Sequence, residues 1–195
     1  EGIETARLNG KIIGGTVTKG NKKTTKKSIQ AKEIIKKGKE NHIPISFDPN
    51  LRPALWKSQE VMIESLNFLA FQSDIVLPGI EEGKILTGFE EKEKIADFYL
   101  QHGVKEVIIK MGGEGAYYKT SEKEGVVEGF SVKEIVDTVG AGDGFAVGVI
   151  SGRLEQLPIE EYVKRGNCIG ALQIQVEGDN EGLPNRERLQ NALNG

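Results

Sequence analysis

One stretch of the chain combines small residues with two carboxylates in a spacing that suits phosphate chemistry. Residues 137–143 read Asp-Thr-Val-Gly-Ala-Gly-Asp and lead into a segment with apolar residues at helical spacing. Backbone N–H groups at a helix N-terminus stabilise phosphate oxygens, and glycines let the backbone approach them closely. Asp143 is the informative member, because a carboxylate there repels phosphate unless it accepts a proton or contacts a metal. A helix-capping Asp is the alternative reading, but the whole string favours chemistry.

A second polar stretch follows an apolar segment nearer the N-terminus. Residues 46–56 read Ser-Phe-Asp-Pro-Asn-Leu-Arg-Pro-Ala-Leu-Trp and run past the end of a strand expected at residues 43–48. Open α/β sheets bind ligands at this end of their strands. Asp, Pro and Asn are also ordinary turn residues, so a plain turn over residues 48–50 would be favoured if Arg52 did not follow. An arginine can make bidentate contacts with a phosphate or a carboxylate.

Three further segments carry weaker signals. Residues 110–115, Lys-Met-Gly-Gly-Glu-Gly, follow an expected strand, and a glycine-rich β-turn explains them equally well. Glu82 lies at the start of an expected helix, where a carboxylate also complements the helix dipole. Residues 176–184 form a turn-rich segment after a long helix, which a C-cap and loop would explain.

Alternating helix and strand patterns predict an α/β fold that positions these segments. We expect helices over residues 28–40, 58–71, 80–87 and 92–102, and strands over residues 11–15, 43–48, 74–77 and 106–110. These strands lack in/out alternation, which predicts a largely parallel sheet with helices on both faces. Glycine-rich turns then separate residues 116–119 from 126–130, which predicts an antiparallel hairpin and hence a mixed sheet. The last third is expected to be helical.

Composition narrows the class of protein. A chain of 195 residues and 21.3 kDa predicts a single domain over residues 1–195. A formal charge of -3 and a pI near 5.6 argue against nucleic-acid binding, and no apolar run is long enough to span a bilayer. Cys168 is the single cysteine, which excludes an intramolecular disulfide and suits a reducing cytoplasm. Small-molecule partners are therefore expected, with no nucleic acid and no membrane.

The motif at residues 137–143 resembles the signature of the PfkB, or ribokinase-like, family of carbohydrate kinases. The resemblance implies ATP and Mg²⁺ as cofactors, and Asp143 as the base that deprotonates the acceptor hydroxyl. It further implies that the amides of Gly140, Ala141 and Gly142 stabilise charge on the transferred phosphoryl group. This assignment agrees with the demands of phosphoryl transfer, which are in-line positioning and neutralisation of charge.

The resemblance also gives roles to the remaining segments. It places Asn50 and Arg52 near the nucleotide phosphates or the substrate, and Lys110, Gly112, Gly115, Asp137 and Thr138 along the nucleotide. Glu82 would act on Mg²⁺ through water, although Gly79 replaces the asparagine of the family's Asn-x-x-Glu element. The Phe-Asp-Pro-Asn-Leu-Arg form resembles kinases of 2-keto-3-deoxygluconate in particular, and in those Asp179 would contact the hydroxyls of the sugar acid.

The implied fold is a ribokinase-like three-layer α/β/α sandwich. The resemblance covers about residues 43–193, so the N-terminal part and the lid of the family are expected to be missing from the chain. The implied reaction is ATP-dependent phosphorylation of 2-keto-3-deoxygluconate to its 6-phosphate. We also expect a cytoplasmic protein and a homo-oligomer. The alternatives are a ribokinase or fructokinase activity and a non-catalytic nucleotide-binding fragment. We expect the chain to keep a nucleotide and catalytic-base half-site without closing over a sugar.

Overall fold

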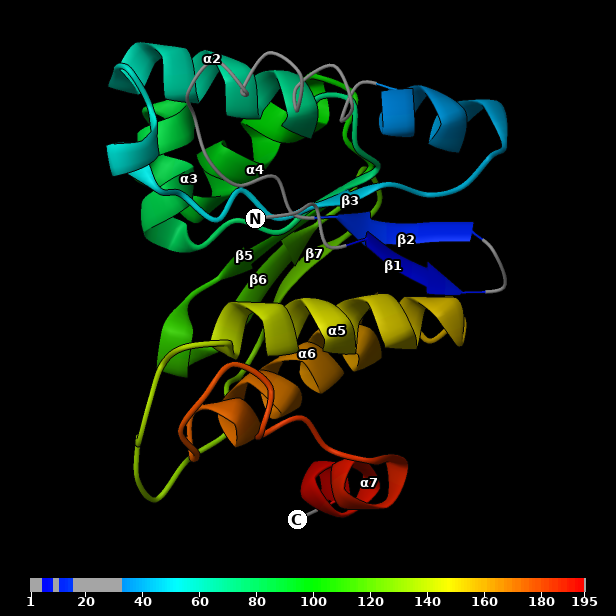
Figure 1. The fold of residues 1–195 in the computed structure, drawn as a ribbon, viewed down its shortest axis with the longest axis vertical. Coiled ribbons are helices and arrows are strands. Elements are labelled where there is room, and N and C mark those ends of the chain that lie inside the picture. The colour runs from blue at the N-terminus through cyan, green and yellow to red at the C-terminus, as the bar shows by residue number, and fades with distance from the viewer. Residues whose placement is uncertain (1–4, 9–10, 16–32, 195) are drawn as a thin grey trace. The chain divides into compact units, whose positions relative to one another are not determined.

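The computed structural model describes residues 5–8, 11–15 and 33–194 (Figure 1). The chain divides into two compact units, Glu1–Val107 and Ile108–Gly195. Strands β3 to β7 are hydrogen-bonded in the order β3-β4-β5-β6-β7, and β5, Glu106–Lys110, contributes residues to both units. Within the described part of the chain, no helix is long and apolar enough to cross a membrane.

The first unit begins with a two-stranded antiparallel ribbon of β1, Thr5–Leu8, and β2, Lys11–Gly15. The strand predicted at residues 11–15 is confirmed, whereas β1 was not expected. A helix covers residues 33–40, which confirms the end of the helix predicted at 28–40. The start of that prediction, residues 28–32, lies outside the described residues.

The parallel part of the sheet consists of short strands. β3, Ser46–Phe47, pairs with β4, Ile75–Val76, and β4 pairs in turn with the start of β5. Both strands are shorter than the predicted ranges 43–48 and 74–77. Before β3, a distant side chain replaces a strand partner: the backbone N–H of Ile45 bonds to the side chain of Asp74 at 2.9 Å, and Pro44 has no N–H to offer.

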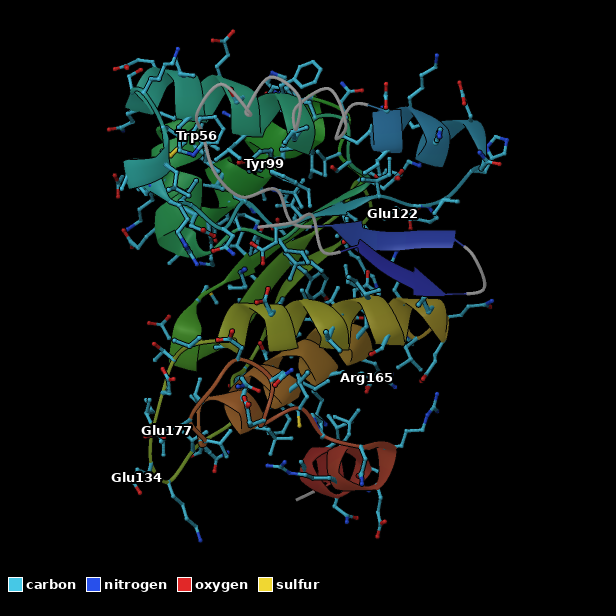
Figure 2. All side chains as sticks on the ribbon, viewed as in Figure 1. Trp56, Tyr99, Glu122, Glu134, Arg165 and Glu177 are labelled. Carbon is cyan, nitrogen blue, oxygen red and sulfur yellow. The ribbon has the colours of Figure 1, made fainter. Side chains whose placement is uncertain are left out.

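Three helices complete the first unit, and each matches its predicted range within two residues. They are α2 (Gln59–Ala70), α3 (Ile80–Thr87) and α4 (Lys92–Gln101). Ser58 begins α2, where its hydroxyl accepts the N–H of Val61 at 3.4 Å. Met62, Leu66 and Leu86 form a buried cluster between α2 and α3, with Trp56 packed against it (Figure 2).

A buried polar chain joins the three helices. The hydroxyl of Tyr99 on α4 donates to Asn67 Oδ1 on α2 at 3.3 Å, and Asn67 Nδ2 donates to the carbonyl of Leu86 on α3 at 2.7 Å. Figure 2 shows Tyr99 among these helices. Burial raises the pKa of Tyr99, so the phenol stays protonated and keeps its donor role. The helices are thus held by directional bonds as well as by apolar packing.

The second unit contains the antiparallel part of the sheet. β6, Ala116–Lys119, pairs with β7, Glu124–Val127, which confirms the mixed sheet, although β7 lies earlier than the predicted 126–130. Beyond Val127 the backbone of Gly129 lies against Gly113, where an added Cβ would meet the carbonyl oxygen.

The hairpin is tied to α6, Ile159–Gln173, by a charged group. Glu160 accepts hydrogen bonds from the ammonium of Lys123 at 2.8 Å and from the hydroxyl of Tyr118 at 2.8 Å. The Lys123 ammonium, and after it a backbone bond and the Tyr118 hydroxyl, lower the pKa of Glu160 to about 2. The carboxylate therefore stays ionised at neutral pH.

Helix α5, Ala141–Leu154, lies alongside α6 with the two backbones in contact (Figure 1). Glycines line the crossing: a Cβ added to Gly148 would lie 2.6 Å from Gly166 Cα, and one added to Gly152 would lie 2.5 Å from Tyr162 Cβ. The predicted apolar spacing of α5 identified the helix but not this glycine stripe. The close approach of the two backbones fixes the direction of α5. The last helix, α7, spans Arg186–Asn194 and packs on α6.

Candidate active site

The motif at residues 137–143 leads into the N-terminus of α5, as its sequence predicts. Gly140 is the N-cap in a left-handed conformation, with φ of 76°, and an added Cβ would overlap the carbonyl oxygen of Asp179. Only glycine fits there. Asp143 lies in the first turn of α5 with its side chain exposed. A helix N-terminus with an accessible carboxylate is the arrangement that the sequence leads us to expect.

The predicted amides differ in their availability. The N–H of Ala141 points to the carbonyl of Thr138 at 3.4 Å, a long and weak hydrogen bond. The N–H groups of the first helical turn have no partner inside their own helix, so those of Gly142 and Asp143 can serve an anion. Ala141 is thus less available than Gly142 among the amides that we predict for charge stabilisation.

A cation stands beside this turn. Lys110 ends β5, and its Nζ lies 3.6 Å from the position that a Cβ on Gly142 would occupy. An ammonium at this distance favours negative charge at the helix N-terminus. The structure therefore brings Lys110 together with residues 140–143, which the sequence alone could link only through the order of the motifs.

Asp137 and Asp179 connect the motif to the loop after α6. Asp137 accepts the N–H of Val139 at 3.0 Å and, more weakly, that of Gly178 at 3.5 Å. Its carboxylate therefore organises the turn. The side chain of Asp179 is exposed, while its backbone carbonyl packs closely against Gly140. Figure 2 labels Glu134 and Glu177 on the two segments, which are joined by the bond from Val136 N to the carbonyl of Ile174, 2.8 Å long.

The glycine-rich turn after Lys110 is a short 3₁₀ helix, Gly112–Glu114. Gly112 and Gly115 have φ of 61° and 96°, and the N–H of Met111 donates to the carbonyl of Gly115 at 2.8 Å. A Cβ on Gly115 would overlap the carbonyl oxygen of Val127, whereas open space surrounds Gly112. Gly115 is therefore required by the turn itself, whereas no atom lies within 4 Å of a Cβ added to Gly112.

The Asn50 and Arg52 segment belongs to the first unit. Asn50 has a left-handed conformation, with φ of 43°, and the guanidinium of Arg52 is exposed and donates to the carbonyl of Leu51 at 3.0 Å. The N–H of Leu51 donates to Glu82 Oε1 at 2.7 Å. The loop that presents Arg52 is thus fastened to the start of α3.

Comparison with known proteins identifies the family. A family model described as pfkB family carbohydrate kinase matches residues 13–186. The chain belongs to the pfkB family. Over 149 residues it is 56% identical to a 2-dehydro-3-deoxygluconokinase of Bacillus subtilis (strain 168), covering 76% of this chain and 46% of that protein. The chain therefore spans about half the length of this relative.

Solved structures of pfkB-type proteins share the fold. A PfkB protein from Polaromonas sp. JS666 is 46% identical, with a TM-score of 0.73 over 83% of this chain and 50% of the other. A putative ribokinase II from E. coli, solved with ATP and Mg²⁺, is 30% identical, with a TM-score of 0.79 over 86% of this chain and 54% of the other. These matches confirm the ribokinase-like α/β/α fold class.

Few side chains of this pfkB chain are placed to bind the Mg²⁺ that the sequence predicts. Within residues 33–194 and the two short strands described before them, no group of three or more His, Cys, Asp or Glu could hold a metal ion. Mg²⁺ usually takes one or two carboxylates and completes its shell with water and substrate phosphates, so the donors present are compatible with it. The water-mediated role of Glu82 stays a prediction.

Glu82 has a structural role that the sequence analysis missed. Besides Leu51, it accepts the N–H of Gly79 at 2.8 Å, so its two oxygens join the Arg52 loop to the N-cap of its own helix. A glutamate three residues after an N-cap is the signal that could have revealed half of this arrangement. The contact with Leu51 spans 31 residues of sequence and has no local signal.

Replacing Glu82 with alanine tests whether its carboxylate holds the Arg52 loop to the start of α3. Glu82→Ala leaves the N–H groups of Leu51 and Gly79 without their acceptor, so we expect the free energy of unfolding to fall by about 1–3 kcal/mol in urea titrations. Glu81→Ala is the matched control, because that side chain is 76% exposed and forms a surface ion pair with Lys84. It should cost about 0–1 kcal/mol. An equally small loss of the free energy of unfolding in both variants would contradict this role of Glu82.

Proposed function

We propose that the chain is the nucleotide-binding and catalytic-base part of an ATP-dependent kinase that converts 2-keto-3-deoxygluconate to its 6-phosphate. The observation that carries the proposal is the exposed Asp143 in the first turn of α5, beside the amides of residues 140–143 and the ammonium of Lys110. This arrangement pairs a proton acceptor with donors for phosphate charge. The likeness to the Bacillus subtilis 2-dehydro-3-deoxygluconokinase supports the sugar acid as substrate.

The chemistry follows from the positions of these groups. Asp143 accepts the proton of the primary hydroxyl as the hydroxyl oxygen attacks the γ-phosphorus and the bond to the β–γ bridging oxygen breaks. The first-turn amides of α5 and the ammonium of Lys110 stabilise the negative charge on the transferred group. Mg²⁺, when it accompanies ATP, supplies further charge neutralisation, and Glu82 is the carboxylate proposed to hold its water.

Arg52 and Asp179 are proposed to recognise the substrate. Both side chains are exposed, so they are free of the packing that would hide them from a ligand. The guanidinium of Arg52 is suited to the carboxylate of a sugar acid or to a phosphate, and the carboxylate of Asp179 is suited to hydroxyl groups. A substrate carboxylate is the feature that separates a sugar acid from ribose or fructose.

Substrate competition tests the proposal. In the complete protein that carries this chain, kcat/KM for 2-keto-3-deoxygluconate should exceed those for ribose and fructose by at least about 100-fold, since neutral sugars leave a charged site unpaired. ADP formation is measured with each sugar under the same conditions. Equal kcat/KM values would instead favour a general sugar kinase. A rise in melting temperature with ATP but no ADP formation with any sugar would favour a non-catalytic nucleotide-binding protein.

A further inference from the structure

One fully buried polar side chain in the second unit takes no part in the proposed chemistry. Gln173 is the last residue of α6 and has 0% of its surface exposed. Its Nε2 donates to the carbonyl of Gly178 at 2.7 Å, and its Oε1 accepts the N–H of Gly182 at 3.0 Å. One amide group therefore bridges both ends of the loop that follows the helix, and its own polar atoms are satisfied by the backbone.

This loop reaches the catalytic motif directly. Both backbone polar groups of Gly178 are hydrogen-bonded. Its N–H donates to the Asp137 carboxylate, and its carbonyl accepts from Gln173 Nε2. The next residue is Asp179, whose carbonyl oxygen lies where a Cβ of Gly140 would be. Gly140 is the N-cap of α5. A continuous set of contacts thus leads from Gln173 to the first turn of α5.

We propose that Gln173 is a positioning residue for the catalytic helix N-terminus. By holding residues 178–182 against Gly140, it fixes the direction of the first-turn amides and of the Asp143 carboxylate. Packing supports the same role, because a Cβ on Gly182 would lie 2.5 Å from Gln173 Cα, so the loop is seated directly on the end of α6. The consequence for phosphoryl transfer rests on the proposed function, whereas the positioning itself does not.

The chemistry of the carboxamide suggests a decisive variant. A glutamine offers one donor and one acceptor here, and a protonated glutamic acid offers the same pair, whereas an ionised glutamate offers acceptors alone. In Gln173→Glu the ionised carboxylate would face the carbonyl of Gly178 and push the loop away. Protonation restores the donor. Burial raises the pKa of such a carboxyl, which brings its titration toward neutral pH.

The test follows the backbone amides of residues 140–143 by ¹H–¹⁵N NMR without ligand. We expect these signals to shift in Gln173→Leu, and to shift in Gln173→Glu at pH 8 but to return to the wild-type positions at pH 5. Exchange of the Gly182 amide with solvent should be about 10-fold faster in Gln173→Leu, the equivalent of one lost hydrogen bond. Val163→Ala, a buried change elsewhere on α6, should leave residues 140–143 unshifted.

Two results separate the positioning role from the proposed function. ADP binding measured by calorimetry should be about 10-fold weaker in Gln173→Leu than in Val163→Ala, if the turn binds nucleotide. Wild-type protein that binds no ADP would contradict the proposed function and leave the amide shifts to decide the role of Gln173. Unshifted signals for residues 140–143 in Gln173→Glu at pH 8 would overturn the positioning role, even if Gln173→Leu failed to fold.

Discussion

Asp143→Asn is expected to lower the rate of phosphoryl transfer to the sugar acid by about 10²–10⁴-fold, the usual contribution of a general base. Asparagine keeps the size of the side chain and the start of α5 but cannot accept the hydroxyl proton. The affinity for ADP should stay the same or rise, because a negative charge beside the phosphates is removed. Steady-state kinetics and calorimetry on the same preparations check both parts.

The control for Asp143→Asn is another exposed carboxylate of the second unit. Glu134→Gln removes a charge from the loop before the motif, and it should change the rate by less than about threefold because that carboxylate receives no proton from the substrate. Two outcomes would contradict the assignment. The first is a loss below tenfold in Asp143→Asn, and the second is a loss of ADP binding that accounts for the whole fall in rate.

Gly148→Ala is expected to have the largest effect on stability. The added Cβ would lie 2.6 Å from Gly166 Cα and 2.7 Å from its nitrogen, so the backbones of α5 and α6 must separate. Overpacking of this kind costs about 1–3 kcal/mol or more. The sign of the change in the free energy of unfolding is informative, because replacing glycine with alanine at an open helix position would instead stabilise the protein by up to about 1 kcal/mol. Urea titration followed by circular dichroism measures the change.

Gly113→Ala is the matched glycine control. No atom lies within 4 Å of its added Cβ and its φ is not positive, so the free energy of unfolding should change by less than about 0.5 kcal/mol. A Gly148→Ala protein as stable as the wild type would show that the helices can separate without cost. The close backbone approach would then not fix the direction of α5.

The sequence predicts the helices well because each has a local signal. Ser58 precedes α2 as an N-cap, and Gly79 and Gly88 flank α3 as its N-cap and C-cap. The strands are predicted less well, because their ends depend on distant partners. Before β3 the N–H of Ile45 bonds to the side chain of Asp74, and beyond β7 the backbone of Gly129 lies against Gly113. Neither contact leaves a pattern in the neighbouring sequence.

In the candidate site, too, local features could be predicted from the sequence and contacts between distant residues could not. The position of Asp143 at a helix N-terminus follows from the glycines before it and the apolar residues after it. The neighbours of that turn could not be predicted, because Lys110 comes from β5 and the carbonyl of Asp179 from the loop after α6. Gln173 and Glu82 were missed as positioning residues for the same reason: a buried polar side chain acts through contacts that only the fold creates.

The most direct test of the central claim is the identity of the phosphorylated product. The complete protein is incubated with ATP and 2-keto-3-deoxygluconate, and the products are followed by ³¹P NMR. We predict a new phosphomonoester signal that is split by the two protons of C6, formed in step with ADP and absent with Asp143→Asn over the same time. Release of inorganic phosphate alone, or an equal ester signal with Asp143→Asn, would contradict a sugar kinase that uses Asp143 as its base.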